Sequence, residues 1–253
     1  MRYCLKNSKK NRNFFEMEKI TEIKKGQTGN GLLVENDGYV SLTEGSNRKL
    51  YEDYKRLNEE ASGGEFHCPY PFIVSAVFQK YGIQNANGRI YPENVLRREV
   101  DKYMTAIREK RALGECNHPS ETVIDLSRTA MNIVELHWEN HTLVGKLEVI
   151  TSPGYRKYGI ISCQGDQVAN LLLQGLRVGV SSRGLGSVTN KMGTLYVGDD
   201  YEIVCWDFVS SPSTPNAWVS LNDEGLQTFI ECDEHKGKTA IDEKINKALE
   251  LLG

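Results

Sequence analysis

The sequence predicts an α+β domain, in which strand-like runs alternate with helical segments. Residues 72–78 are almost continuously apolar and rich in β-branched and aromatic side chains, which is typical of a largely buried strand. Residues 92–110 place apolar side chains at the spacing of an amphipathic helix. Residues 133–138 and 143–150 are two strand-like runs joined by a short polar segment, which predicts a hairpin.

The first turns and helix ends carry local signals. An Asn-Gly pair at 87–88 marks a tight turn, and Pro92 suits the first turn of the helix that follows it. Residues 166–174 predict a short second helix, with Asp166 as a candidate N-cap and Gly175 as its end.

The later strands surround a glycine-rich stretch. The β-branched residues Val178 and Val180 lead into Gly179–Ser187, which we interpret as a strand entering a bend. Residues 194–197 and 201–209 then predict another hairpin around a Gly-Asp-Asp turn.

Composition limits the class of protein. The chain has 253 residues, of which 39% are hydrophobic and 26% charged, and this suits one large domain or one domain with tails. The net charge of −3 gives no general attraction to nucleic acid or to an anionic membrane, and no apolar run is long enough to span a bilayer. The six cysteines are scattered without CxxC spacing, so we expect reduced thiols, with no disulfide framework, no metal and no cofactor.

The ends of the chain differ from its centre. Residues 1–65 mix charge runs with Gly/Asn pairs and have little to bury, so we expect a largely disordered, flexible N-terminal arm or propeptide. The folded domain is predicted for residues 66–222. Residues 223–253 are interpreted as a polar linker followed by a C-terminal amphipathic helix, which docks on its own domain or on a partner.

Ser181 is the first candidate for chemistry. In a glycine-rich stretch its Oγ meets little steric crowding, and the following N–H groups and Arg183 can face a developing negative charge. The alternative is an ordinary Ser/Gly hairpin turn. Because successive strand side chains point to opposite faces, only one of Ser181 and Ser182 can be the nucleophile, and the residues alone do not choose between them.

A serine nucleophile needs a base and a group that orients the base. His118 lies in a tight segment bounded by glycine and proline, which can fix its rotamer and expose a ring nitrogen; the alternative is a surface or packing histidine. Asp207 stands between Trp206 and Phe208 in a predicted strand, on the face opposite those two aromatics. The alternative interpretation of Asp207 is a solvent-facing acid, and the residues alone favour this alternative.

A metal-dependent hydrolase is the competing enzyme class. Its ligands would be Glu115 and His118 with His137 or His141. The two latter histidines flank a hairpin turn, where a four-residue spacing does not put them on one face, so the pattern fits no established metal site.

Four short motifs, in this order, resemble one known family. They lie at Asn85–Pro92, Leu113–Pro119, Gly179–Ser187 and Asp207–Val219. Together they resemble the T4-type phage prohead (capsid maturation) serine proteases, which are similar in fold to the herpesvirus assemblins. The resemblance covers roughly residues 70–221 and implies a mostly antiparallel β-barrel surrounded by helices.

The resemblance also implies roles for residues. Ser181, the first serine of its pair, would be the nucleophile, His118 the general base and then acid, and Asp207 the third member. Arg183 and the neighbouring backbone at Ser182 and Gly184 would stabilise the oxyanion and bind substrate. No catalytic role is assigned to the motif at Asn85–Tyr91.

Substrates and location follow from the same resemblance. They would be scaffold and precursor capsid proteins inside a prohead in the host cytoplasm, with no nucleic-acid or membrane partner and with a homo-oligomer as an option. The T4-type pattern of cleavage is an aliphatic residue, any residue, Glu and then a small residue. Residues 42–45 fit it, which predicts self-cleavage between Glu44 and Gly45. The alternative function is a catalytically inactive protease-fold structural or scaffold-associated virion protein, which would have no need of all three catalytic residues.

Overall fold

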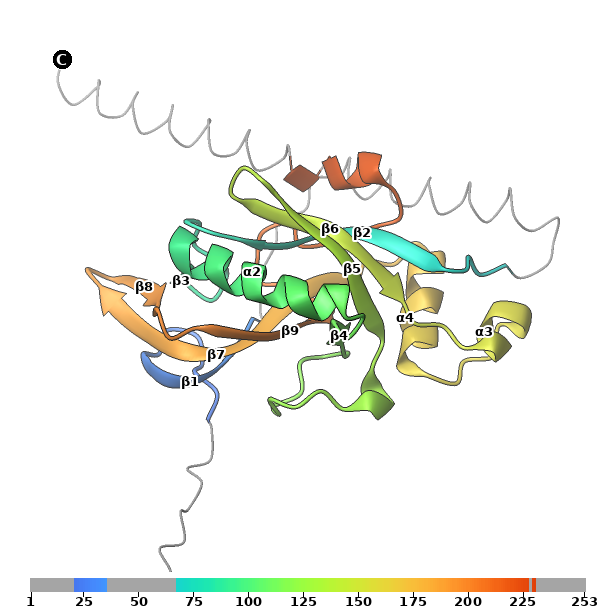
Figure 1. The fold of residues 1–253 in the computed structure, drawn as a ribbon, viewed down its shortest axis with the longest axis horizontal. Helices are drawn as coiled ribbons and strands as arrows, with labels where there is room; N and C mark the ends of the chain where they lie inside the picture. The colour runs from blue at the N-terminus through green and yellow to red at the C-terminus, as the bar shows by residue number, and fades with distance from the viewer. Residues whose placement is uncertain (1–20, 36–66, 228, 231–253) are drawn as a thin grey trace, which may run out of the picture.

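Two five-stranded sheets pack around a main hydrophobic core, beside which lies a second, smaller cluster, in this computed structural model, which describes residues 21–35, 67–227 and 229–230 (Figure 1). The first sheet contains β1 (Gly29–Val34), β7 (Gly179–Lys191), β8 (Thr194–Val197), β3 (Arg89–Ile90) and β9 (Glu202–Val209). The second has the order β10 (Val219–Ser220), β2 (Phe72–Lys80), β6 (Thr142–Val149), β5 (Met131–Glu139) and β4 (Leu113–Gly114). The α+β class and the hairpin of β5 and β6 are confirmed.

Helices pack against strands of both sheets. They are α2 (Glu93–Arg108), the 3₁₀ helix η1 (Leu126–Arg128), α3 (Pro153–Tyr158) and α4 (Gln164–Leu173). Helix α2 starts after Pro92, as predicted, and packs against both β5 and β9, whereas α4 lies against β6 (Figure 1). Asp166 is not the N-cap of α4, because Cys163 holds that position. Asp166 is the third helical residue, and its carboxylate accepts the backbone N–H of Cys163.

The resemblance implies a closed or nearly closed β-barrel, and the part of the chain that the structure describes does not form a closed one. No ladder within the described ranges closes the two sheets into one barrel, and the assemblin-like fold therefore stays a prediction. The sheets meet through two isolated bridges, Gly179 with Trp218 and Cys116 with Phe208. Strands β4 and β10, which stand at the meeting edges, are each two residues long and cannot extend those bridges into ladders.

β7 does not end at its glycines, although its register against β9 shifts between Arg183 and Gly184. It continues as one strand through residue 191, and both β8 and β9 pair with it, so the predicted hairpin between the segments at 194–197 and 201–209 is wrong. The glycines of β7 instead allow Tyr201 to pack closely against the strand. A Cβ at Gly184 would overlap the Tyr201 ring, and one at Gly186 would lie 2.9 Å from Tyr201 Cα.

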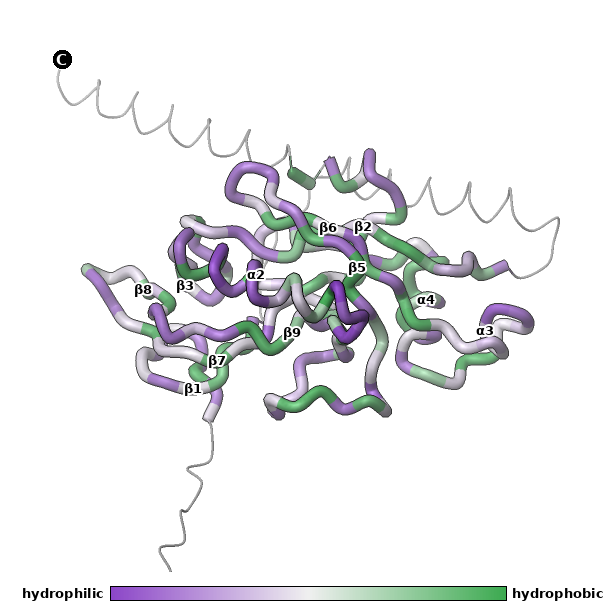
Figure 2. The backbone as a smooth tube through the Cα atoms, viewed as in Figure 1, coloured by the Kyte–Doolittle hydropathy of each residue, from purple (hydrophilic) through white to green (hydrophobic). Residues whose placement is uncertain are grey.

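Trp206 joins the layers at the centre of the core. Its ring stands edge-on to Phe78 of β2 at 5.7 Å and to Tyr103 of α2 at 4.9 Å between centroids. Figure 2 shows hydrophobic residues along β2, α4 and the middle of β9, which are the segments that meet in this core. Within the described part of the chain, no helix has the length and apolar character needed to cross a membrane.

Part of the N-terminal arm departs from the expectation for residues 1–65. β1 pairs antiparallel with β7 over six residues, from Gly29 opposite Val188 to Val34 opposite Arg183. Ile23 and Leu33 are buried in the main core, so this piece does bury apolar surface. The predicted C-terminal helix and the Glu44–Gly45 bond lie outside the described residues.

Candidate active site

Ser181 and Asp207 stand opposite each other in the β7–β9 ladder. Opposed residues of an antiparallel pair carry their side chains on the same face, and Arg183, two residues along β7, shares that face. Ser182 is opposite Trp206 and so points to the other face, toward the aromatic core. The pairing register thus puts Ser181, the serine that the resemblance favoured, on the face of Asp207, a choice that the residues alone left open.

β9 holds the loop that carries His118. Phe208 N–H donates to the Glu115 carbonyl at 2.9 Å, and Asn117 N–H donates to the Phe208 carbonyl at 2.8 Å. The Glu115 N–H also donates to Asp207 Oδ1 at 2.8 Å. These contacts fasten the loop along the strand and deliver His118 beside Asp207.

The His118 ring is held by Asp207. His118 Nδ1 lies 2.7 Å from Asp207 Oδ2, and both side chains are fully buried. The ring's other nitrogen, Nε2, is buried without a hydrogen-bond partner among the described residues. The solvent-facing alternative for Asp207 is therefore wrong, and the histidine has one engaged and one available nitrogen.

The charge of Asp207 is stabilised. Burial raises the pKa of this carboxyl, but the hydrogen bond and charge of His118, the charge of Arg183 and the Glu115 N–H together lower it more. The net pKa lies below the ordinary value for aspartate. Asp207 is thus an anion at neutral pH, which suits a group that orients an imidazole and stabilises its protonated form.

The backbone at the histidine is unusual. Asn117 and His118 have φ angles of 65° and 43°, in the left-handed region that non-glycine residues seldom adopt. Such conformations cost on the order of 1–3 kcal/mol and occur where the surroundings impose them, often at functional sites. The hydrogen bonds to β9 are those surroundings here.

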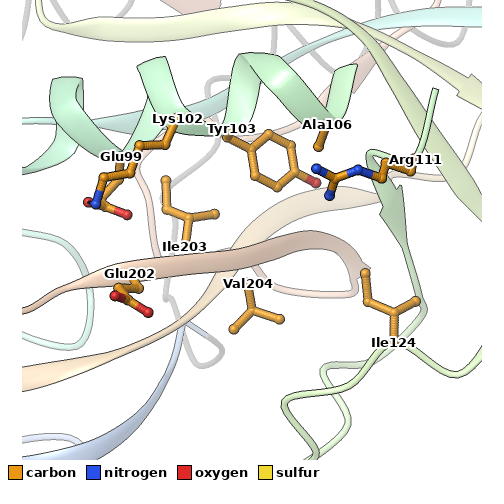
Figure 3. Close-up of a pocket in the computed structure, with 9 residues that line it drawn as sticks. All are labelled: Glu99, Lys102, Tyr103, Ala106, Arg111, Ile124, Glu202, Ile203 and Val204. Atoms are coloured by element: carbon orange, nitrogen blue, oxygen red, sulfur yellow. Dashed lines mark hydrogen bonds and ion pairs between the residues drawn. The ribbon is translucent and has the colours of Figure 1, made fainter. Parts of the chain in front are cut away.

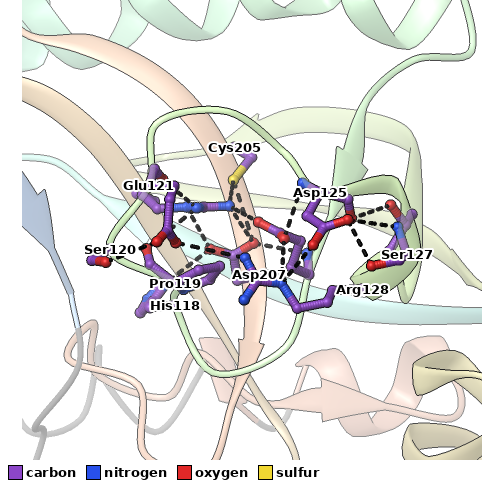
Figure 4. A network of polar contacts seen from close by, with 12 residues as sticks. His118, Pro119, Ser120, Glu121, Asp125, Ser127, Arg128, Cys205 and Asp207 are labelled. Carbon is purple, nitrogen blue, oxygen red and sulfur yellow. Dashed lines mark hydrogen bonds and ion pairs between the residues drawn. The ribbon is translucent and has the colours of Figure 1, made fainter.

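Arg183 is fully buried and bonds to this loop, whose network of polar contacts Figure 4 shows around His118 and Asp207. Its guanidinium pairs with Glu115 Oε2 and lies 3.0 Å from Asp207 Oδ2, with all three side chains fully buried. It also donates to the backbone carbonyls of Pro119 at 3.3 Å and Glu121 at 2.5 Å. The Arg183 side chain therefore connects the loop that carries His118 to β7.

The two cysteines nearest Asp207, Cys116 and Cys205, are not activated as nucleophiles. Burial raises the pKa of the Cys116 thiol to about 12, and the charges of Asp207 and Glu115 add to the effect. Burial and the Asp207 charge likewise raise the pKa of Cys205 well above its ordinary value. Both stay protonated at neutral pH, whereas a thiolate is the reactive form.

Ser181 already has a partner. Its Oγ–H donates to the backbone carbonyl oxygen of Glu35, the residue directly after β1. Sequence reasoning missed Glu35 and the role of Glu115 beside Arg183. Glu115 lies inside a motif that drew attention mainly to its histidine, and Glu35 lies in a segment that we expected to be disordered.

Comparison with known proteins decides the family. Residues 32–225 match the family described as prohead core protein serine protease. The prohead core protein protease of Enterobacteria phage T4 is 32% identical over 196 residues, which cover 76% of this chain and 89% of that protein. The chain belongs to the prohead core protein serine protease family. A solved structure, that of the bacteriophage T4 capsid assembly protease, gp21, is 28% identical and covers 54% of this chain and 80% of its own, with a TM-score of 0.49.

The family confirms the resemblance that the four motifs indicated and makes this chain a protease of phage capsid maturation. The matched region begins at residue 32, inside β1, and ends at residue 225. It therefore includes the end of β1 and Glu35, which contacts Ser181, as well as the predicted catalytic residues.

Two cavities of this prohead protease adjoin β9. One of about 390 Å³ lies between α2 and β9 and is lined by Tyr103, Arg111 and Ile203 among others (Figure 3). Another of about 160 Å³ borders the His118 loop at Cys116 and Asn117. Neither lining includes Ser181, which agrees with Glu35 covering its hydroxyl.

The metal-ligand set does not assemble. Within the residues that the structure describes, no group of three or more His, Cys, Asp or Glu side chains is arranged to hold a metal ion. Glu115 and His118 each engage other partners in the prohead protease site, while His137 lies 3.3 Å from Glu135 on the hairpin.

Proposed function

We propose that this prohead protease is a serine endopeptidase with Ser181 as nucleophile, His118 as general base and acid, and Asp207 as the group that orients His118. The observation that carries the proposal is the 2.7 Å contact between His118 Nδ1 and Asp207 Oδ2, directly across the ladder from Ser181. A buried aspartate bound to Nδ1 selects the tautomer in which Nε2 can accept a proton.

The reaction would run through an acyl-enzyme. Ser181 Oγ bonds to the scissile carbonyl carbon while its proton passes to His118 Nε2. The tetrahedral intermediate then breaks its C–N bond, and His118 gives the proton to the departing amine. Water, deprotonated by the same nitrogen, attacks the ester and releases the new carboxylate and the free serine.

The residues around Ser181 take supporting roles. Arg183 is a positioning residue, since its guanidinium binds Glu115 and Asp207 beneath the histidine loop. Ser182 and Gly184 would bind substrate through their backbone groups, which face an added strand beside β7. This keeps the expected substrate contact of these two residues.

The proposed substrates are the scaffold proteins and the major capsid protein precursor of a tailed phage, cleaved after glutamate inside the prohead in the host cytoplasm. Membership of the prohead core protein serine protease family and the name of the T4 relative support this class. No cofactor or nucleic acid takes part in the reaction as proposed, and a homo-oligomer is compatible with it.

Co-expression with the phage scaffold and capsid precursors tests the function. Mass spectrometry should find both substrates cut after glutamate with the wild-type chain and with Ser182→Ala. Ser181→Ala should leave them full length. Intact substrates with every variant would instead support the alternative, a protease-fold structural or scaffold-associated virion protein without activity.

Self-cleavage between Glu44 and Gly45 is part of the proposal. The bond fits the expected pattern of aliphatic residue, any residue, Glu and small residue. The intact mass of the matured protein should show the loss of residues 1–44, and Glu44→Gln should prevent that loss. A mature chain that keeps the segment 40–50 intact would contradict it.

A further inference from the structure

The cavity of about 390 Å³ between α2 and β9 is a groove with a helix on one side and a strand on the other (Figure 3). Tyr103 lines it from α2, and Ile203 and Val204 line it from the start of β9. Ile124, from the segment that follows the His118 loop, lines it as well. None of the lining residues belongs to the proposed catalytic set, so the proposed reaction does not account for this α2–β9 groove.

The strand side of the groove is an unpaired edge. β9 pairs with β7 along one edge, and on its other edge the bridge of Phe208 with Cys116 lies near the end of the strand. At residues 202–204, no strand of the described ranges pairs with that outer edge. Such an edge offers backbone N–H and C=O groups to an added chain, and strand addition is a general mode of peptide recognition.

The helix side of the groove is held in place. Arg98 Nη2 donates to the backbone carbonyls of Asp199 at 2.7 Å and Tyr201 at 3.2 Å, which ties α2 to the turn before β9. Glu99, the next residue, is neutralised, because Arg98 Nε and Lys102 Nζ lie 2.8 Å and 2.7 Å from its Oε1. The groove is therefore preformed, and this lowers the entropic cost of binding a ligand there.

Tyr103 has a buried hydroxyl that needs an acceptor. The residue is 9% exposed, and its Oη makes no hydrogen bond with any residue that the structure describes. Burial raises the pKa of this phenol, so Oη keeps its proton at neutral pH and is a donor. Buried polar groups are nearly always hydrogen-bonded, because an unmade bond leaves the cost of desolvation uncompensated. The hydroxyl therefore indicates an acceptor from outside the described chain.

Arg111 indicates which acceptor that is. Figure 3 shows its guanidinium and the Tyr103 hydroxyl pointing toward one another, and both residues line the groove. Arg111 pairs with Glu109, but the two side chains are 63% and 53% exposed, and an exposed pair of this kind is weak. A neutral hydroxyl donor beside a guanidinium suits a carboxylate, which accepts hydrogen bonds from both.

We propose that the α2–β9 groove docks an extended segment of a partner protein that carries an acidic side chain. The main chain of the segment adds as a strand to the outer edge of residues 202–204, and one of its apolar side chains packs against Tyr103 and Ile203. Its carboxylate accepts from Tyr103 Oη and the Arg111 guanidinium. Because β9 continues to Asp207, docking places the partner on the strand that holds the candidate site. The inference goes beyond the proposed function and does not depend on it.

Peptide binding to the full chain tests the carboxylate site. The probe is a fluorescent peptide, Asp-Val-Thr-Val-Asp, which has an acid at each end of a strand-forming centre and does not match the pattern for cleavage after glutamate. The matched peptide is Asn-Val-Thr-Val-Asn. Fluorescence anisotropy should show that the aspartate peptide binds at least tenfold more tightly than the asparagine peptide. Equal affinity for the two peptides, or no binding of either, would overturn the inference.

Two variants assign the carboxylate to its donors. Tyr103→Phe removes only the hydroxyl and should weaken binding of the aspartate peptide at least threefold, and Arg111→Gln should weaken it at least tenfold. Tyr158→Phe and Arg108→Gln change residues outside the lining and should leave the affinity unchanged. Because the hydroxyl has no bond to lose within the described residues, Tyr103→Phe should keep or raise Tm, which separates weaker binding from unfolding. Affinity that neither groove variant changes would contradict the proposal.

Hydrogen exchange tests the added strand. Saturating aspartate peptide should increase the protection of the backbone amides at residues 202–204. The amides of β8, which already has β7 and β3 on its two edges, should exchange as before. Bound peptide without added protection at residues 202–204 would overturn strand addition in the groove.

Discussion

At the scale of single residues, Asp207 is the side chain on which most contacts of the candidate site depend. It binds His118 Nδ1, the Glu115 N–H and the Arg183 guanidinium at once. We expect Asp207→Asn to lower kcat for a glutamate peptide by about 10³–10⁴-fold, because an amide no longer selects the tautomer that leaves Nε2 free. Steady-state kinetics check this, with Asp199→Asn in an exposed turn as the control that should keep wild-type kcat.

The lowered pKa of Asp207 also predicts how stability depends on pH. The carboxyl binds its proton less readily folded than unfolded, where its pKa is about 3.9. Its contribution is therefore complete above about pH 4 and is lost as pH falls through the lowered folded value. Urea unfolding from pH 7 to pH 3 should show the advantage of wild type over Asp207→Asn shrinking at the acid end. An advantage that stays constant to pH 3 contradicts this assignment.

Glu115 is the second buried acid of the site. Glu115→Gln removes the charge opposite Arg183 inside a fully buried pair, and we expect a loss of about 3–5 kcal/mol in the free energy of unfolding. Arg128, the other cationic partner of Glu115, is 43% exposed, so Arg128→Ala should cost under about 1 kcal/mol. Chemical denaturation of the two variants compares them directly. Equal losses would mean that the pair with Arg183 is not the one that matters.

The candidate site shows how far residues alone could lead. The resemblance carried by the motifs grouped Ser181, His118 and Asp207 and chose Ser181 over Ser182, and the β7–β9 register puts Ser181 on the face of Asp207. Glu35 was missed because the residues that bind its carboxylate lie 50 or more positions away in the sequence. No local pattern reveals such contacts. Burial of Asp207 was missed because alternation tells which face a strand residue takes and not whether that face is covered.

β7 is the element in which local signals misled most. Gly and Ser clusters commonly mark turns, so the sequence predicted a bend where the structure has a continuous strand. The actual need for glycine is steric and comes from Tyr201, a residue far along the chain. Helix α2 was predicted well, since its apolar spacing and Pro92 are properties of the segment itself.

The steric role of glycine in β7 makes a prediction for the element. Gly184→Ala would push a methyl group into the Tyr201 ring and to within 2.7 Å of the Glu202 carbonyl oxygen, and we expect a loss of about 1–3 kcal/mol. Gly154→Ala in α3 is the control, because its nearest neighbouring atom is 4.0 Å away, and it should be neutral or slightly stabilising. Thermal denaturation compares the two, and a neutral Gly184→Ala would refute the steric explanation.

The molecule as a whole rests on contacts between its two sheets. The sequence predicted the α+β class and a central domain, whereas the resemblance alone implied a closed barrel. The edge strands β4 and β10 have two residues each and do not form the ladders that would close it. Closure depends on pairings between segments far apart in the chain, which periodicity cannot specify. The place of β1 on β7 was missed for the same reason.

Trp206 tests this view of the whole fold. It connects β9 to β2 and α2, so Trp206→Ala should lower the free energy of unfolding by about 3–5 kcal/mol. Trp138 is a matched control on the β5–β6 hairpin, where it is partly exposed and stacks with Arg97, and Trp138→Ala should cost about 1 kcal/mol. Urea unfolding followed by circular dichroism distinguishes them, and equal losses would contradict a core centred on Trp206.

The most direct test of the central claim is the rate at which the purified full chain hydrolyses a Leu-Thr-Glu-Gly peptide, compared among wild type, Ser181→Ala and Ser182→Ala. The register of β7 and β9 predicts that Ser181→Ala abolishes hydrolysis after glutamate, while Ser182→Ala, whose hydroxyl points to the aromatic core, retains it. Hydrolysis that survives in Ser181→Ala, or that disappears in Ser182→Ala alone, would contradict Ser181 as the nucleophile.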